Sequence, residues 1–185
     1  LKLNVANIFL QKAHHTSISS CIIQGNWASS PQNVNGIRAE NSDGLVLSNL
    51  WIENSGGSAG FDISLRNTNG TSINGYHSNA APVTANDFPG GNIEFISARA
   101  TEIVGMISKS PTLHFKQDSN SFGNRVSASR LSVPENVFNS FDSSPNGLTL
   151  DNNVVFEGDV ASGNTGMYRG TGQMLDDWYG AQLLT

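Results

Sequence analysis

An apolar pair ten residues apart recurs along this chain and constrains its fold more than any other feature. The pairs are Ile8 with Ile18, Ile37 with Leu47, Ile63 with Ile73, and Ile93 with Ile103. A weaker fifth copy starts at Leu113, so the copies begin 29, 26, 30 and 20 residues apart. Repeats of this length predict a solenoid, because each unit can bury its apolar face only against neighbouring units.

Each copy opens with an alternating pattern that predicts a β-strand. If the first apolar residue is position 0, positions 0 and +2 are apolar in every copy, whereas +1 and +3 are mixed. A period of two is that of a half-buried strand. Further short strands are predicted near +8 to +10 and +13 to +15, and the length differences fall in the loops that close each copy. Three strands per coil describe an all-β parallel β-helix.

Two positions of the repeat predict where the chain turns and what it buries. Position +4 carries Asn41 and Asn67 in successive copies. Asparagine tolerates the left-handed conformation of a sharp corner, and its amide can bond to the coil above or below. One inward position is shared by Cys21, Leu50, Tyr76 and Met106. We therefore expect Cys21, the single cysteine, to be a small buried hydrophobe.

The pattern changes near residue 117, which predicts two regions. Residues 1–117 form the parallel β-helix coils, and residues 118–185 form a smaller non-helical β region that caps the solenoid or forms a trimer interface. Segment 119–134 is strand-like but has lost the inward apolar positions, and 148–156 predicts a hairpin around residues 151–153. The tail after residue 158 carries Met and aromatic side chains, which we expect to cap the stack or pack against other chains.

The composition argues against several classes of protein. Charged residues make up 14% of the chain, the formal net charge is −5, and no run of Lys or Arg occurs, so a nucleic-acid partner is not expected. No apolar window of about 18 residues exists, so membrane insertion is not expected either. A single cysteine excludes an intrachain disulfide framework and a multi-cysteine metal site. We expect no metal and no cofactor.

The chain resembles a bacteriophage tailspike, a right-handed parallel β-helix of the pectin-lyase-like superfamily. The resemblance rests on the coils at 8–23, 37–52, 63–78 and 93–108 and on the change of pattern near residue 117. It implies a homotrimer on the virion, assembled in the host cytoplasm, that binds bacterial surface polysaccharide and cleaves it by hydrolysis or β-elimination. Two alternatives stay open: a non-catalytic glycan-binding and trimerisation module of such a spike, and a monomeric bacterial pectin-lyase-like enzyme.

Charged side chains gather at the outward positions of the first strand of each copy. The candidate catalytic residues are Glu40, Arg66 and Glu94, and the candidate substrate-binding residues on this strand are Arg38, His114 and Lys116. Glu40 and Arg66 occupy equal positions in adjacent coils, about 5 Å apart, where they could grip a uronic acid or a sugar hydroxyl. The alternative is a cross-strand ion pair on a solvated face, worth about 0.2–1 kcal/mol.

The two candidate glutamates are widely spaced for glycoside hydrolysis. Glu40 and Glu94 are two coils and two residues apart, which predicts a separation of about 12 Å. An inverting hydrolase places its carboxyl groups roughly 6.5–9.5 Å apart, so this pair needs twist or a long rotamer to act together.

Trp51 and His77 are predicted to share an outward position one coil apart. Aromatic faces stack on sugar rings, so both are candidate substrate-binding residues. The alternative is a surface ladder without a ligand.

Overall fold

A computed structural model describes residues 6–24, 35–53, 60–79, 91–109, 114–132, 148–150, 155–157, 168–169 and 173–174, and no helix occurs among them. Sheet A is parallel and consists of β1 (Ala6–Gln11), β4 (Asn35–Asp43), β6 (Phe61–Asn69), β8 (Gly91–Ile96) and β11 (Phe115–Gln117). Sheet B consists of β2 (Ser17–Ser19), β3 (Ile22–Gln24), β5 (Val46–Glu53), β7 (Ser72–Asn79), β9 (Glu102–Val104), β10 (Ile107–Lys109), β12 (Asn124–Ser127), β13 (Arg130–Ser132), β14 (Leu148–Leu150) and β15 (Val155–Glu157). A separate antiparallel pair consists of β16 (Tyr168–Arg169) and β17 (Gln173–Met174).

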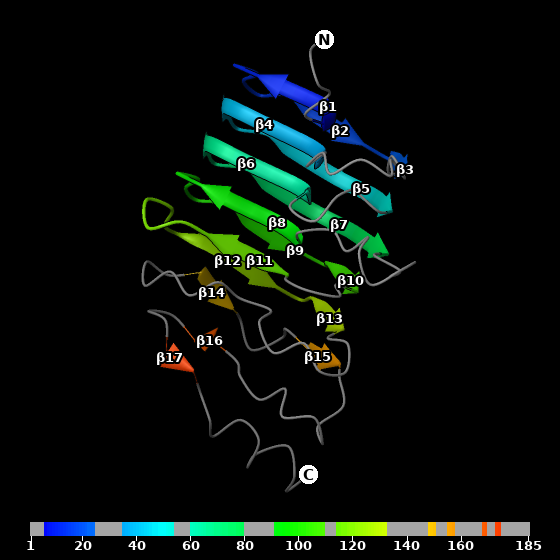
Figure 1. The fold of residues 1–185 in the computed structure, drawn as a ribbon, viewed down its shortest axis with the longest axis vertical. Coiled ribbons are helices and arrows are strands. Elements are labelled where there is room, and N and C mark those ends of the chain that lie inside the picture. Colours follow the sequence, from blue (N-terminus) through cyan, green and yellow to red (C-terminus); the bar gives the residue numbers. More distant parts are fainter. Residues whose placement is uncertain are drawn as a thin grey trace, which may run out of the picture.

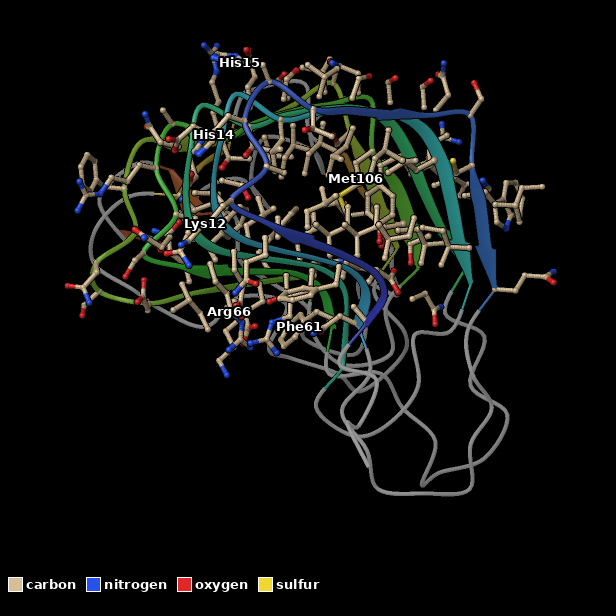
Figure 2. The ribbon with its side chains drawn as sticks, turned by 90° about the horizontal axis from the view of Figure 1, so that it is seen from above. Lys12, His14, His15, Phe61, Arg66 and Met106 are labelled. Atoms are coloured by element: carbon tan, nitrogen blue, oxygen red, sulfur yellow. The ribbon has the colours of Figure 1, made fainter. Side chains whose placement is uncertain are left out.

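The strands alternate between the two sheets, as in a parallel β-helix. One coil comprises a strand of sheet A followed by two strand segments of sheet B. The segments are separate strands in the first coil, β2 and β3, whereas β5 and β7 each run through both. The coils stack along the long axis of the molecule (Figure 1), and viewed along that axis their walls enclose the core (Figure 2). The predicted all-β parallel β-helix is confirmed.

The predicted register is confirmed for the first four coils. Position 0 forms the column Ile8, Ile37, Ile63 and Ile93. The column ten residues later is Ile18, Leu47, Ile73 and Ile103. In the fifth coil the prediction is wrong by two residues, because Phe115 and not Leu113 lies opposite Ile93. A slip of two keeps every side chain on the same face, so an alternating sequence pattern does not distinguish the two registers.

The coils turn at columns of left-handed residues. Among the described residues, every positive φ falls in one of three columns: Lys12, Asn41, Asn67 and Ser97; His15, Gly44, Gly70, Ala100 and Gly123; and Ser20, Asn49, Gly75, Gly105 and Ala128. The first two columns flank the turn from sheet A to sheet B, and the third marks the bend between the two segments of sheet B. Asn67 Nδ2 donates to Asn41 Oδ1 at 2.7 Å, which confirms the predicted asparagine corner for these two coils.

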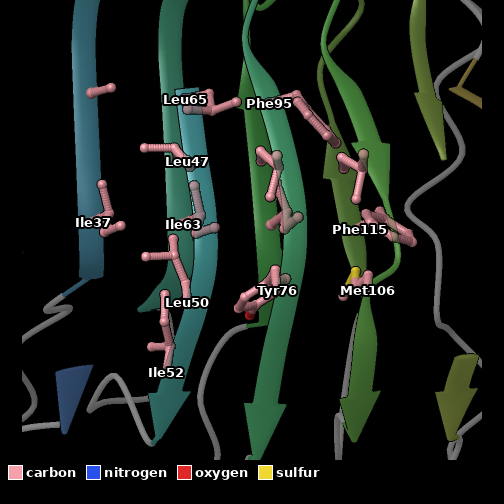
Figure 3. Packing of buried hydrophobic residues seen from close by; sticks show 14 of the residues in the cluster. Ile37, Leu47, Leu50, Ile52, Ile63, Leu65, Tyr76, Phe95, Met106 and Phe115 are labelled. Atoms are coloured by element: carbon pink, nitrogen blue, oxygen red, sulfur yellow. The ribbon is translucent and has the colours of Figure 1, made fainter. Parts of the chain in front are cut away.

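One apolar core runs along the inside of the stack (Figure 3). Its largest fully buried side chains are Tyr76, Phe95, Phe115, Ile37, Leu45, Leu47, Leu50, Ile52, Ile63, Leu65, Ile73 and Ile93. Complete burial of one such aliphatic side chain contributes about 1.5–3 kcal/mol. The predicted inward position is confirmed, since Leu50, Tyr76 and Met106 are buried and Cys21 is partly buried against the core.

The parallel ladders continue beyond residue 117. β12 pairs with β9 and β13 with β10, and Val126 and Leu131 are buried, so the predicted loss of inward positions in segment 119–134 is wrong. The predicted hairpin is also wrong for the described strands, because β14 and β15 pair in parallel with β12 and β13. The division into 1–117 and 118–185 stays a prediction. Most of the aromatic tail lies outside the described residues.

The first four coils differ in length only between the last segment of sheet B and the next strand of sheet A. From position 0 to the end of that segment, the first four coils span 8–24, 37–53, 63–79 and 93–109, which is 17 residues each. The connecting stretches between the strands, 25–34, 54–60, 80–90 and 110–114, contain 10, 7, 11 and 5 residues, and all of them except residues 60 and 114 lie outside the described part. Sheet A therefore begins each coil directly after a segment of variable length.

Candidate functional site

Charged side chains lie in register on the outer face of sheet A. One column across the sheet is Phe9, Arg38, Ser64, Glu94 and Lys116, and two residues further along lie Gln11, Glu40 and Arg66. These positions alternate with the core positions of the same strands and so face away from the core, although Ser64 and Glu94 are themselves buried. Figure 2 shows Arg66 on the outside of the coils. We call Arg38, Glu40, Ser64, Arg66, Glu94 and Lys116 the charged face.

Glu94 is the centre of the larger of two ion-pair groups on the charged face. Its Oε2 accepts from Arg66 Nη2 at 2.8 Å and from Ser64 Oγ at 2.8 Å, and Lys116 Nζ lies 3.9 Å from Oε1. Arg66 Nε also donates to Ser64 Oγ at 3.0 Å. Only 8% of the Glu94 side chain is exposed. A carboxylate this well covered is stable because charged donors and a hydroxyl compensate its lost hydration.

Lys116 also lies above an aromatic ring, with its Nζ 5.9 Å from the centre of Phe61. Phe61 is buried, whereas 47% of the Lys116 side chain is exposed. The ring and Glu94 together favour an ammonium at this place. The predicted outward position of Lys116 is confirmed, although it faces Glu94 across the ladder and not the column of Arg66.

Arg38 and Glu40 form the second ion-pair group within one strand. Arg38 Nε donates to Glu40 Oε1 at 2.7 Å, and Arg38 Nη2 donates to the same oxygen. Glu40 and Arg66 lie opposite each other as predicted, but the ion pair considered between them does not form. Residues two apart on a strand share a face, so Glu40 reaches Arg38 and leaves Arg66 to Glu94.

These pairings bear on the catalytic roles predicted for Glu40, Arg66 and Glu94. A general base or nucleophile needs a carboxylate that can reach the reacting atom. Both oxygens of Glu94 face cations, and its side chain is largely covered, whereas Glu40 is about one-fifth exposed and paired through one oxygen. The geometry is that of a hydrogen-bonding surface more than that of a carboxylate pair prepared for cleavage. The catalytic assignments stay predictions.

The predicted outward position of His114 is wrong. The residue before Phe115 follows the column of Asp62 and Asn92, and its ring is fully buried. His114 Nδ1 lies 2.8 Å from Asn92 Oδ1 and 3.2 Å from Ser108 Oγ. The two-residue register shift in the fifth coil moves His114 from the column of Glu94 to the position before it along the strand, the column of Asp62 and Asn92, which is buried. Its substrate-binding role stays a prediction.

His114 belongs to a buried polar network that the sequence analysis missed. Asp62 Oδ2 accepts from Tyr76 at 2.5 Å, Ser78 at 2.5 Å and Asn92 at 3.1 Å, and Ser108 donates to Asn92 Oδ1 at 2.5 Å. Burial raises the pKa of Tyr76 well above its usual value, and the charge of Asp62 and its hydrogen bond raise it further. The sequence signal that could have predicted this network is position −1 of the repeat. Asp62 and Asn92 are polar residues at this position, each directly before a core isoleucine.

Trp51 and His77 lie on the outer face of sheet B, away from the charged face. They are opposite each other in the ladder as predicted, with ring centres 3.9 Å apart and planes at 68°. Ile22 and Ile107 extend this column on either side and are 74% and 50% exposed. The structure thus places the predicted binding residues on two walls of the solenoid, and the substrate-binding role of Trp51 and His77 stays a prediction.

No family model, curated protein or solved structure matches the chain. Within the described residues, no three His, Cys, Asp or Glu side chains gather to hold a metal ion. The described part also contains no helix long and apolar enough to cross a membrane. What the chain does must therefore be argued from its own surfaces.

Proposed function

We propose that this chain is a β-helical segment of a trimeric, tailspike-like virion protein that binds bacterial surface polysaccharide along the outer face of sheet A. The observation that carries the proposal is the charged face, which brings six hydrogen-bonding side chains from four strands together. Four of them, Arg38, Glu40, Arg66 and Lys116, are partly exposed, and the buried Ser64 and Glu94 hold Arg66 in place. Such a concentration is notable in a chain with 14% charged residues. Arg38, Arg66 and Lys116 supply the donors for sugar hydroxyls and acid groups.

The scaffold suits a polymeric ligand. Parallel strands repeat about every 4.8 Å along the stack, so equivalent positions present their side chains at regular steps. Side chains on strands are held more rigidly than side chains on loops, and their ion pairs restrict them further. A polysaccharide lying along the stack can therefore contact several coils without first ordering the protein.

Depolymerisation is the second candidate function, and the partial exposure of the Glu40 carboxylate favours it. Its side chain is about one-fifth exposed and it shares a surface with Glu94. An enzyme of the tailspike type or a monomeric pectin-lyase-like enzyme would need Glu40 to leave Arg38 and act on the substrate. Binding requires no such rearrangement, and we therefore place it first.

The first experiment combines light scattering with a panel of purified capsular and O-antigen polysaccharides. A mass three times that of the chain and saturable binding support the proposal, and a fall in polysaccharide viscosity adds depolymerisation. A monomer that lowers viscosity favours the pectin-lyase-like alternative. A chain that neither binds nor cleaves any member of a broad panel contradicts the proposed function.

Substitution of Glu40 tests whether the charged face carries the binding. Glu40→Ala removes the partner that holds Arg38, so we expect polysaccharide binding, and any cleavage, to weaken by about fivefold, or roughly 1 kcal/mol. Folding should be nearly unchanged because the pair is on the surface. The matched control is Asp43→Ala, which removes a carboxylate from the same strand that pairs with His14 at the exposed corner. If Glu40→Ala bound the polysaccharide as tightly as Asp43→Ala and the wild type, the Glu40 site would be excluded.

A further inference from the structure

We infer that the charged face selects an acidic polysaccharide and that a sugar carboxylate binds the outer edge of the Arg66 guanidinium beside Lys116. This inference rests on the proposed function and names its ligand class. Some N–H donors of Arg66 and Lys116 already bind Ser64 and Glu94, and the remaining donors lie at the surface, where a ligand can reach them.

Arg66 is held along one edge and open along another. Nε donates to Ser64 and Nη2 donates to Glu94, and these two nitrogens form the side edge of the guanidinium. A guanidinium has five N–H donors. One N–H on Nη1 and one on Nη2 make up the terminal edge, which matches the two oxygens of a planar carboxylate. In the described structure no hydrogen bond uses the terminal edge, and 34% of the side chain is exposed.

Lys116 completes the binding position because it shares Glu94 with Arg66. The ammonium approaches Oε1 and the guanidinium approaches Oε2 of the same carboxylate, so both cations are held near each other. Of the two, Lys116 is the more exposed. Glu94 is thus a positioning residue, because it orients two cations without itself being open to a ligand.

Arg38 repeats the arrangement one coil away. Its Nε and Nη2 donate to Glu40 along the side edge, which leaves its terminal edge uncommitted among the described residues. Arg38 lies across the ladder from Ser64, the residue that accepts from Arg66. Two guanidinium groups with oriented terminal edges on adjacent coils suit a polymer that carries acid groups along its length.

The charge balance also favours an anionic ligand. The charged face has three cations, Arg38, Arg66 and Lys116, against two carboxylates, Glu40 and Glu94, so its formal charge is +1. The whole chain has a formal charge of −5. An acidic polymer is therefore repelled by the molecule in general and attracted to this wall, which directs its binding.

The test measures binding of the full chain to four polymers: polygalacturonate, its methyl ester, dextran, and dextran sulfate. The methyl ester lacks the carboxylate charge of polygalacturonate and carries a methyl group in its place. Dextran sulfate reports unspecific attraction to polyanions. The variants are Arg66→Lys, which keeps the charge but loses the planar fork, and Lys116→Gln, which leaves the Arg66–Glu94 pair intact. Arg99→Gln is the matched control, since Arg99 is exposed at a corner outside the charged face.

We expect polygalacturonate to bind and its methyl ester to bind at least about tenfold more weakly. Arg66→Lys should weaken polygalacturonate binding by about tenfold, as expected for loss of a charge-assisted bidentate contact. Lys116→Gln should weaken it severalfold, and Arg99→Gln should leave it unchanged. Thermal unfolding of each variant separates a binding defect from a folding defect, and Lys116→Gln decides the matter if Arg66→Lys does not fold.

Three results would overturn the inference in distinguishable ways. Equal binding of polygalacturonate, its ester and dextran retains polysaccharide binding but excludes selection of acid groups. Tight binding of dextran sulfate that Arg66→Lys does not change shows general polyanion attraction and excludes the carboxylate fork. Failure to bind any of these polymers, together with failure on the bacterial panel, removes the proposed function as well.

Discussion

Asp62 shows how a single charged residue is accommodated at the centre of this solenoid. Its carboxylate is fully buried and accepts hydrogen bonds from Tyr76, Ser78 and Asn92. An unpaired buried carboxylate would be strongly destabilising, whereas three donors replace much of its hydration. Each donor comes from the same coil or the next one, so the network also ties neighbouring coils together.

The Tyr76 hydroxyl should make the stability of the protein depend on pH in the alkaline range. The pKa of Tyr76 is raised because burial and Asp62 disfavour the phenolate, whereas an unfolded tyrosine ionises near pH 10. Stability from the protonated hydroxyl is therefore complete below about pH 10 and is lost as pH rises further. We expect Tyr76→Phe to cost about 1–3 kcal/mol at neutral pH, because Asp62 loses a donor.

Urea unfolding at several pH values between roughly 8 and 11 measures this contribution. The wild-type unfolding free energy should fall over the upper part of that range, and the fall should be smaller for Tyr76→Phe. Equal slopes for the two proteins would mean that the buried hydroxyl does not contribute to the high-pH loss of stability.

At the scale of single strands and turns, two glycines illustrate different reasons for having no side chain. Gly36 is the second residue of β4 and lies next to the backbone of β6. A Cβ there would lie 2.7 Å from the carbonyl oxygen of Asp62 and 3.0 Å from Ile52 Cγ2. Gly70 lies at a corner with φ of +68° and has no atom within 4 Å of such a Cβ. Gly36 is thus required because a side chain would have no space, whereas Gly70 is favoured because it takes the left-handed backbone without strain. His15 and Ala100 take the same conformation at this corner in other coils.

Alanine at these two glycines should destabilise the protein by different amounts. Gly36→Ala forces backbone atoms apart and should cost about 2–3 kcal/mol. Gly70→Ala meets only the left-handed strain and should cost about 1 kcal/mol. Chemical denaturation of the two variants, compared with the wild type, gives the order. A larger loss at Gly70 would contradict the close approach of β4 and β6.

The same elements show what the sequence could and could not predict. Period-two alternation and the repeat predicted sheet A and its register, because one face of each strand must be buried. The fifth coil was misplaced by two residues, since His114 and Phe115 satisfy the alternation in either register. The cross-strand ion pair considered between Glu40 and Arg66 does not form, because Glu40 pairs with Arg38 and Arg66 pairs with Glu94. Side-chain geometry decides these pairs, and residue spacing does not specify it.

For the whole molecule, stability is distributed along a stack in which each coil contacts its neighbours. Ile63 lies in the middle of sheet A between Ile37 and Ile93 and is fully buried. The equivalent residue of the first coil, Ile8, is only partly buried against the core. Damage at a central coil should therefore affect both halves of the solenoid, whereas damage at an end coil should remain more local.

An aspartate at Ile63 tests this organisation. Ile63→Asp places a lone carboxylate in an apolar core and should cost more than about 4 kcal/mol. We expect insoluble protein or the loss of its β-sheet circular dichroism. The matched control is Ile22→Asp, whose side chain is 74% exposed and which should change stability by about 0.5 kcal/mol or less. A soluble, fully folded Ile63→Asp variant would contradict the inward register.

The constant length of the ladder in the first four coils has a practical consequence for protein engineering. Each of the first four coils keeps a ladder of 17 residues, whereas the stretches between the strands contain 10, 7, 11 and 5 residues. The ladder therefore tolerates connections of different length at one place in each coil. A longer connection costs little, because the entropy lost on closing a loop rises slowly with loop length. Foreign peptides grafted into these stretches would be displayed in a row about 4.8 Å apart per coil. The solenoid could thus serve as a scaffold for arrays of grafted epitopes.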